Sequence, residues 1–266
     1  MTFFPKKNRV LECLRKNEVP IGLELYTGNA SIVEIAAYAG FDFYMLDMEH
    51  STVNIETMKH LITAADAAGI TTIVRVPENN GAIIARAVEE GAMGVIVPHT
   101  TSAEDVIKSQ NALRYPPYGK KGSCTAIRGA NYSTAGWEEY LEHHNNEVML
   151  IALLEDPDAI NNAEEIFAQL KPGRDAVWFG RCDLAQSLTK LGEKVNWDHP
   201  FVLEGFEKII ALSKKTGIPV LGIPWPVANA ENCKAVINKG ARILLYNIDQ
   251  LLIYDAFSAA IKAMKA

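Results

Sequence analysis

Eight short, mostly apolar runs recur along the chain, and they constrain its fold more than any other feature. Each is five to eight residues long, and most are continuously apolar, which is typical of parallel strands covered on both faces. Helical periodicity fills the stretches between them, and several of these end at a glycine that suits a left-handed C-cap. The expected strands are 19–25, 42–47, 71–76, 94–98, 148–155, 176–180, 218–223 and 242–246, and the expected helices include 30–40, 55–69, 81–91 and 228–240.

This alternation predicts an α/β fold, a single (β/α)8 TIM barrel over residues 1–266, a length close to the roughly 250 residues typical of such barrels. Residues 5–17 predict a helix that closes the bottom of the barrel. The Gly-, Pro- and Ser-rich segment 113–137 is too long for an ordinary connection and predicts a functional loop at the barrel mouth. Residues 249–264 predict a last helix whose apolar face must be buried against another surface.

Composition excludes several classes of partner. A net charge of -6 argues against nucleic acid or an anionic membrane, because both favour a basic surface. The four cysteines are scattered without a CxxC pair, which indicates reduced thiols in a cytoplasmic protein. The first twenty residues lack the apolar core of a signal peptide, and no apolar run approaches the roughly 20 residues that span a bilayer.

Charged residues stand at the ends of several expected strands, where TIM barrels carry their active sites. The second strand ends in Asp47, Glu49 and His50, and the third in Arg75. Alternation along the strand places Asp47 and Glu49 on one face, which we expect to point into the barrel. One charged strand end is more often a cap or an ion pair, but several at one rim favour a functional site. The other candidates are Glu24, Glu155 and Asp183, and His99 is singled out only because it stands at the tip of a strand.

Two of these acids suggest a metal site. Glu155 and Asp183 offer hard oxygen ligands from adjacent strands, and two carboxylates leave positions open for water and substrate, as Mg²⁺ or Mn²⁺ prefers. Gly180 permits close backbone approach, and free N–H groups where Asp183 opens a helix would hold a substrate carboxylate. The expected strand ends carry no lysine, which disfavours a Schiff-base aldolase.

At these residues the sequence resembles the HpcH/HpaI family of metal-dependent class II pyruvate aldolases, and the resemblance covers nearly the whole chain. Five segments carry it in order: 47-DMEH-50, 74-VRVP-77, 91-GAMGVIVP-98, 114-RYPPYGKKG-122 and 180-GRCDL-184. The resemblance implies a barrel of the phosphoenolpyruvate/pyruvate type that reversibly cleaves a 4-hydroxy-2-oxo acid to pyruvate and an aldehyde. It also implies a homo-oligomer, often a hexamer, whose helix 249–264 is exchanged between subunits.

The resemblance assigns roles to the candidate residues. Glu155 and Asp183 would ligate a divalent metal, Mg²⁺ or Mn²⁺ foremost, with Co²⁺ and Zn²⁺ compatible, and pyruvate would chelate it. Arg75 would stabilise the enolate oxygen, since a guanidinium stabilises negative charge where it develops. His50 would be the acid/base near neutral pH, oriented by Asp47. The backbone amides at Gly180, Cys182 and Asp183 would bind the pyruvate carboxylate. Glu49 would support the water bound to the metal, and Glu89 would extend toward the site of a neighbouring subunit.

Some positions depart from the family pattern. Met48 replaces a glycine, Lys121 an arginine and Arg181 a proline, while Cys182 occupies the variable position and Leu153 stands where some members are polar. Arg181 leaves open a preference for an acidic acceptor aldehyde. Two alternative functions also remain open. One is related enolate chemistry, such as an acyl-CoA lyase or decarboxylating C–C bond formation, and the other is a barrel that binds a keto acid without catalysis.

Overall fold

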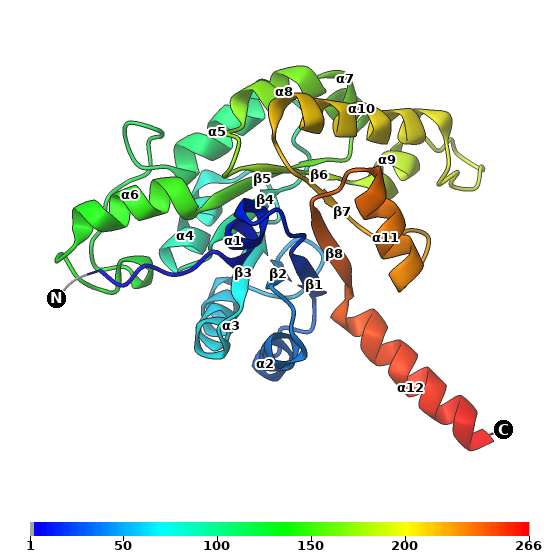
Figure 1. Cartoon of the computed structure of the whole chain (residues 1–266), viewed down its shortest axis with the longest axis horizontal. Helices are drawn as coiled ribbons and strands as arrows, with labels where there is room; N and C mark the ends of the chain where they lie inside the picture. Colours follow the sequence, from blue (N-terminus) through cyan, green and yellow to red (C-terminus); the bar gives the residue numbers. More distant parts are fainter. Residues whose placement is uncertain (1–2, 266) are drawn as a thin grey trace.

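The computed structural model describes residues 3–265, which form a closed barrel of eight parallel strands that pair in chain order (Figure 1). Each expected strand overlaps one of these, which confirms the TIM barrel. The strands are β1 Ile21–Leu25, β2 Phe43–Asp47, β3 Thr71–Arg75, β4 Gly94–Val97, β5 Met149–Leu154, β6 Ala176–Phe179, β7 Val220–Gly222 and β8 Ile243–Ile248.

Helices surround the barrel, and among the described ones none is long and apolar enough to cross a membrane. Five of them begin at an asparagine whose side chain accepts a hydrogen bond from the first turn, as expected of N-caps. The helices are α1 Arg9–Arg15, α2 Ala30–Ala39, α3 Ile55–Ala68, α4 Gly81–Glu89, α5 Ala103–Leu113, α6 Trp137–Glu147, α7 Pro157–Asn161, α8 Ala163–Gln169, α9 Arg181–Ser187, α10 Pro200–Thr216, α11 Ala230–Lys239 and α12 Asp249–Lys265, with a 3₁₀ turn η1 at Arg128–Ala130.

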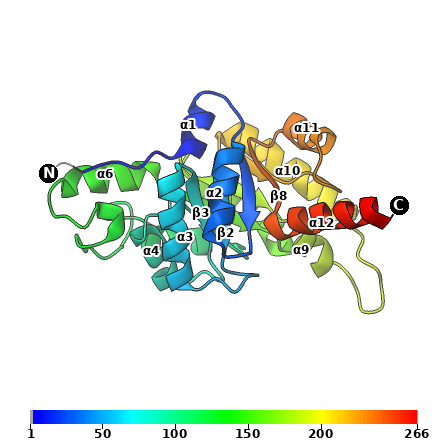
Figure 2. The same ribbon diagram turned by 90° about the horizontal axis from the view of Figure 1, so that it is seen from below.

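The core has two layers, because alternate residues of each strand face the barrel axis and the helices. The outward side chains pack against the helices in one large cluster. The inward set includes Phe43, Ile73 and Ile151, as the alternation predicts, and it also includes Val10 and Leu11 of α1. Helix α1 therefore closes one end of the barrel, and α9 lies at the opposite end (Figure 2).

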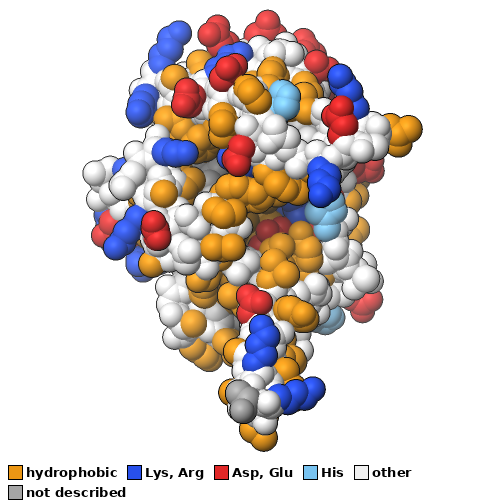
Figure 3. Space-filling view, turned by 90° about the vertical axis from the view of Figure 1, so that its right-hand side faces the viewer, with side chains coloured by type: hydrophobic (Ala, Val, Ile, Leu, Met, Phe, Trp, Pro, Cys, Tyr) orange, Lys and Arg blue, Asp and Glu red, His pale blue; other side chains and the backbone are white. Residues whose placement is uncertain are grey.

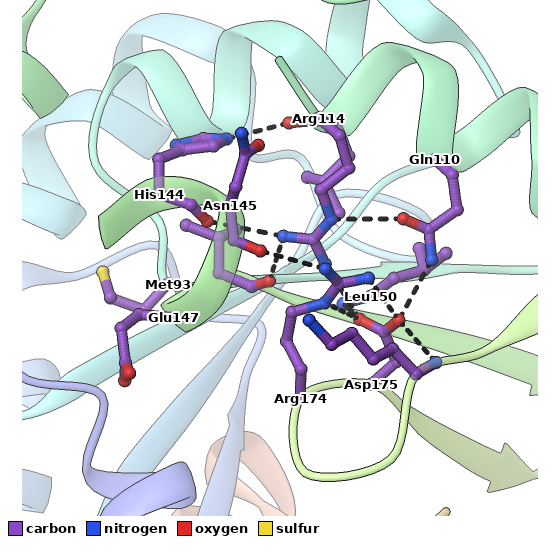
Figure 4. Close-up of polar contacts among 12 residues, drawn as sticks. Met93, Gln110, Arg114, His144, Asn145, Glu147, Leu150, Arg174 and Asp175 are labelled. Atoms are coloured by element: carbon purple, nitrogen blue, oxygen red, sulfur yellow. Dashed lines mark hydrogen bonds and ion pairs between the residues drawn. The ribbon is translucent and has the colours of Figure 1, made fainter. Parts of the chain in front are cut away.

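A buried ionic network ties helices to strands at the end that α1 closes (Figure 4). Arg114, fully buried after α5, donates to Asp175, which directly precedes β6, with Nη2 2.8 Å from Oδ1. Arg174 pairs with the same carboxylate, and Gln110 donates to it as well. Burial favours protonation of Asp175, but the two arginines outweigh it and hold its pKa below the usual value. The charges are thus paired, as a dry environment requires.

The segment 113–137 was expected at the barrel mouth, and the structure places it at the opposite end. It follows α5, which runs from the mouth back to the strand beginnings, and it contacts the N-terminal segment where Asn131 donates to the carbonyl of Phe4. Within it, Lys121 pairs with Glu89 at 2.7 Å. The segment therefore supports the base of the barrel, and within this chain Glu89 lies far from the mouth.

The last helix, α12, projects away from the barrel (Figure 1). Its start is fixed because Asp249, buried beside β1, accepts hydrogen bonds from the backbone of Tyr26 and Thr27. In the first turn Leu252 packs partly against the core and Ile253 is half-buried. From Tyr254 onward the apolar side chains are exposed, Phe257 by 73% and Met264 by 84%. The predicted helix is confirmed, and nothing within residues 3–265 covers the apolar face of this outer part.

Candidate active site

The mouth of the barrel is organised around a buried arginine. The parallel register pairs Arg75 on β3 directly with Asp47 on β2, so their side chains share the inward face. Arg75 Nε donates to Asp47 Oδ1 at 2.7 Å, and Nη2 donates to Glu24 Oε1 at 2.9 Å and to the Tyr26 hydroxyl at 3.1 Å. The guanidinium also lies over Trp178, 5.3 Å from the ring centroid. Nη1 is left without a hydrogen-bond partner among residues 3–265 and can serve a ligand.

The ionisable side chains around Arg75 differ in how readily they carry charge. Burial favours protonation of Asp47, but the hydrogen bond and charge of Arg75 and two backbone amides outweigh it and hold its pKa below the usual value. The acids in turn raise the pKa of Arg75 in spite of its burial. Burial raises the pKa of Glu24 to about 7, and Arg75 offsets only part of that effect. Arg75 and Asp47 therefore stay charged, and Glu24 titrates near neutral pH.

Asp47 also shapes the turn that carries the next two candidates. Its carboxylate accepts from the backbone N–H of Glu49 at 3.0 Å and of His50 at 2.9 Å. Asp47 thus contacts His50 through the backbone of this turn, because its side-chain oxygens accept from Arg75 and these amides. The imidazole is half exposed, and its Nε2 lies 3.7 Å from Glu49 Oε2. His50 stands at the open side of the site, free to meet a substrate.

A second group of ionisable residues lies beside Arg75 and Asp47. Glu49, His99 and Glu155 each place a ligand atom within 4.8 Å of the others. Glu155 accepts from the backbone N–H of His99 at 2.9 Å, and the His99 ring contacts Asp156 at 3.0 Å. Burial raises the pKa of Glu155 to about 7, and the negative charge of Asp183 adds to that effect. Burial also raises the pKa of Glu49 against the pull of Arg75.

These acids fit a divalent cation. Glu49 Oε2 is buried and has no hydrogen-bond partner in residues 3–265, although Arg75 Nε is only 3.2 Å away. Glu155 is buried with a pKa that its surroundings have raised, so a cation beside it would relieve an unfavourable charge. Carboxylate oxygens are the ligands that Mg²⁺ and Mn²⁺ prefer, and His99 adds a nitrogen.

The segment after β6 lies against Glu155. A Cβ built on Gly180 would stand 2.4 Å from the Cβ of Glu155, so glycine is required for this approach. Cys182 and Asp183 follow in the first turn of α9, and both are exposed. Asp183 is not one of the three residues whose ligand atoms cluster, but its charge acts on Glu155.

Arg181 is turned away from these acids. Its guanidinium donates to the carbonyl of Trp197, pairs with Asp198 and lies over Trp225 at 5.0 Å. The side chain therefore links α9 to the segments before α10 and after β7. This engagement argues against the idea that Arg181 meets an acidic acceptor.

Sequence reasoning found most of these residues but missed two features. Tyr26, which binds Arg75, lies just past the end of β1, and its place two residues after Glu24 on the same face was the available signal. His99 was singled out only as the tip of a strand. Its φ of 49°, uncommon for a residue other than glycine, turns the ring toward Asp156, which the sequence does not reveal.

Known proteins share both the fold and the sequence pattern. The family model for HpcH/HpaI aldolase/citrate lyase matches residues 21–256. The chain belongs to this family. It is accordingly a carbon–carbon lyase, and the fold and family expected from the sequence are confirmed. One relative is the 2-keto-3-deoxy-L-rhamnonate aldolase of Escherichia coli, which is 30% identical over 97% of this chain and 94% of its own length. Another is the 2-dehydro-3,6-dideoxy-6-sulfogluconate aldolase of Pseudomonas putida, 33% identical over 78% of each chain.

Solved structures agree with this assignment to the HpcH/HpaI family. The HpcH/HpaI aldolase from Desulfitobacterium hafniense superposes with a TM-score of 0.86, at 28% identity over 96% of this chain and 95% of its own. Citrate synthase SbnG superposes with a TM-score of 0.83, at 27% identity over 96% and 97% of the two chains. Structures described as an aldolase and as a citrate synthase thus share this fold.

Glu24 gives this site a testable pH dependence. In metal-free protein, Glu24→Gln should gain stability relative to the wild type as pH rises from about 4.3 to about 7. The pKa of Glu24 is raised to about 7 in the folded chain, above about 4.3 when unfolded, so the folded chain holds a proton over this window and loses stability as pH rises. The change amounts to at most about 3.7 kcal/mol, for about 2.7 pKa units at 1.36 kcal/mol each.

Urea unfolding in a chelator at about pH 5 and about pH 8 measures this difference. Glu34→Gln, on the exposed face of α2, is the matched control and should show the same difference from the wild type at both pH values. A stability difference for Glu24→Gln that stays constant between the two pH values would contradict the titration of Glu24.

Proposed function

We propose that the protein is a divalent-metal-dependent aldolase that reversibly cleaves a 4-hydroxy-2-oxo acid to pyruvate and an aldehyde. One observation carries the proposal: a buried arginine with a free Nη1 stands beside a cluster of acids suited to a cation, at the end of the barrel where such enzymes act. Cleaving the C3–C4 bond of such a substrate leaves negative charge on a pyruvate enolate, and both groups stabilise that charge.

Several residues of the chain would have distinct roles in this cleavage. Arg75 donates through Nη1 to the keto oxygen of the substrate, because Asp47 and Glu24 hold its other nitrogens in place. His50 removes the proton of the C4 hydroxyl as the bond breaks and returns it in the reverse direction. The backbone at Gly180, Cys182 and Asp183 would bind the substrate carboxylate. A divalent cation held there would act as a Lewis acid on the keto group.

For the cation, we propose Glu155 and Asp183 as carboxylate ligands, with Mg²⁺ or Mn²⁺ as the metal and Glu49 supporting its water. The burial of Glu155 beside Gly180 and the uncompensated Oε2 of Glu49 support this assignment. The negative charge of Asp183 acts on Glu155, which supports Asp183 as the second carboxylate ligand.

The likeness to citrate synthase SbnG favours C–C bond formation with a different enolate as the second candidate. A coenzyme A substrate would need a basic approach to the site. Lys121 and Arg128, two basic residues of segment 113–137, lie at the opposite end, since Lys121 pairs with Glu89 and Arg128 pairs with Asp66 at the base of the barrel. Aldol cleavage is therefore the better supported reaction. Binding without catalysis is disfavoured because it would not require His50.

We further propose that the active enzyme is a homo-oligomer, as large as a hexamer, in which α12 packs on a neighbouring subunit. The uncovered apolar face of α12 supports this, as does a cavity of about 360 Å³ lined in part by Trp225, Val227 and Tyr246. Figure 3 shows hydrophobic side chains gathered around a hollow above the projecting helix. In such an assembly Glu89 would have the chance to approach a neighbour's site.

Exchange of the pyruvate methyl protons tests the reaction. Enzyme, pyruvate and Mg²⁺ or Mn²⁺ in D₂O should lose the methyl signal by NMR, because reversible enolisation replaces these protons. Asp183→Asn should slow the exchange by about 100-fold or more while its Tm stays near the wild-type value. Asp158→Asn, an exposed acid on α7, is the control and should exchange at the wild-type rate. No exchange with any divalent metal would exclude the aldolase.

The packing of α12 is tested by solution mass. Phe257→Glu places a charge on the uncovered face and should shift the protein to smaller species in light scattering, because a buried unpaired charge costs several kcal/mol. Ile107→Glu on α5, on the other side of the barrel, is the matched control and should keep the wild-type mass. A monomeric wild type, or an unchanged mass for Phe257→Glu, would contradict the proposed exchange.

A further inference from the structure

We propose that His99 is a nitrogen ligand of the cation at this site. The carboxylates alone favour Mg²⁺ or Mn²⁺, and the added imidazole shifts the preference of the site from Mg²⁺ toward Co²⁺ and Zn²⁺. The inference rests on the proposed metal-dependent function and adds a ligand that the family resemblance does not supply. It starts from position: His99 follows β4, and the open side of its ring, 60% exposed, leaves room for water and substrate around an ion.

The ring is held as metal-binding histidines are held. Its Nδ1 lies 3.0 Å from Asp156 Oδ2, so Nδ1–H donates a hydrogen bond to Asp156 and the free lone pair of the ring is on Nε2. Histidines that bind metals commonly donate their other ring N–H to a carboxylate in this way, which fixes the tautomer and makes the ligand nitrogen more basic. With Nδ1 held by Asp156, Nε2 is on the side of Glu49.

The distances suit one ion. Nε2 of His99 lies 3.9 Å from Glu49 Oε1, and Glu155 Oε1 lies 3.7 Å from Nδ1 of the same ring. One ligand atom from each of the three residues lies within 4.8 Å of the others. Metal bonds to nitrogen and oxygen of about 2.1 Å place two ligand atoms about 3 Å apart when adjacent and about 4.2 Å apart when opposite. The observed separations need only small side-chain movements to meet a common ion.

The backbone places His99 for this role. Its φ of 49° is rare for a residue with a side chain, and the same turn directs its N–H onto Glu155 Oε1 at 2.9 Å. Thr100 stabilises the turn, since its N–H donates to the carbonyl of Leu153 and its hydroxyl to that of Val97. One turn thus positions an imidazole and fixes a carboxylate on the same side of the site.

The alternative role for His99 is that of an ion-pair partner, a protonated ring among Glu49, Glu155 and Asp156. The two roles differ in what the ring does when metal is added. A ligand nitrogen contacts the ion directly and selects among metals, because imidazole favours Co²⁺ and Zn²⁺ whereas Mg²⁺ prefers oxygen. An ion-pair partner would be displaced and would have no such preference.

Electron spin-echo spectroscopy of bound Mn²⁺ distinguishes the two roles. We expect the full-length protein labelled with ¹⁵N-histidine to show the coupling of a directly bound nitrogen. His99→Asn should abolish that coupling; asparagine is chosen because it tolerates the left-handed conformation and keeps the N–H bonded to Glu155. The control His50→Asn removes the other nearby imidazole, 3.7 Å from Glu49, and should leave the coupling intact.

Binding titrations with Co²⁺, Zn²⁺ and Mg²⁺ measure the selectivity. His99→Asn should weaken Co²⁺ and Zn²⁺ binding by about 10-fold or more and Mg²⁺ binding by less than about 3-fold. A wild type without histidine nitrogen coupling, or coupling lost in His50→Asn and kept in His99→Asn, would overturn the inference. Equal losses for all three metals in His99→Asn would also overturn the selectivity.

These outcomes are separate from those of the proposed function. If Mn²⁺ binds through His99 but pyruvate shows no deuterium exchange with any metal, His99 is a metal ligand and the proposed aldolase activity is wrong. If exchange occurs and no histidine nitrogen contacts the ion, the proposed aldolase activity is supported and the proposal that His99 binds the metal is wrong. The spectroscopy on the wild-type protein needs no variant, so a His99→Asn chain that failed to fold would not block the test.

Discussion

The buried ion pair between Arg75 and Asp47 is the interaction on which the site depends. A guanidinium that is only 5% exposed cannot stay charged in a barrel interior without carboxylates, and Asp47 and Glu24 supply them from the two preceding strands. Asp47 does more than neutralise charge, because its oxygens also hold the amides of Glu49 and His50. One carboxylate therefore fixes the arginine, the acid next to the cation site and the histidine at the open side.

The two ends of the barrel use buried charge differently. At the base, Arg114 and Arg174 both pair with Asp175 and donate to backbone carbonyls, so this network fastens helices to strands. At the mouth, the buried Glu49 Oε2 is left without a hydrogen-bond partner among the described residues, and the hydrogen bonds of Arg75 are made by Nε and Nη2. Glu24 and Glu155 have pKa values raised to about 7. Incomplete pairing of this kind is unfavourable for folding and is expected where a ligand completes it.

Much of the fold followed from the sequence, because strands covered on both faces are apolar throughout and charge at their ends is conspicuous. Alternation placed Asp47 and Arg75 inside the barrel correctly, since parallel register makes them neighbours. The position of segment 113–137 was wrong for an identifiable reason. Its composition indicated an unusual loop but not which end of the barrel it occupies, and its place after a helix determines that end. The contacts of His99 needed the structure, because they depend on a rare backbone conformation that residue type does not encode.

The most direct test of the central claim is a crystal structure of the protein with Mn²⁺ and pyruvate, using the anomalous signal of the metal. We predict a peak within about 2.2 Å of a Glu155 oxygen, with the keto oxygen of pyruvate on the side of Arg75 Nη1. A metal peak remote from Glu155, or pyruvate bound away from Arg75, would contradict the claim that the arginine and the acids form one site.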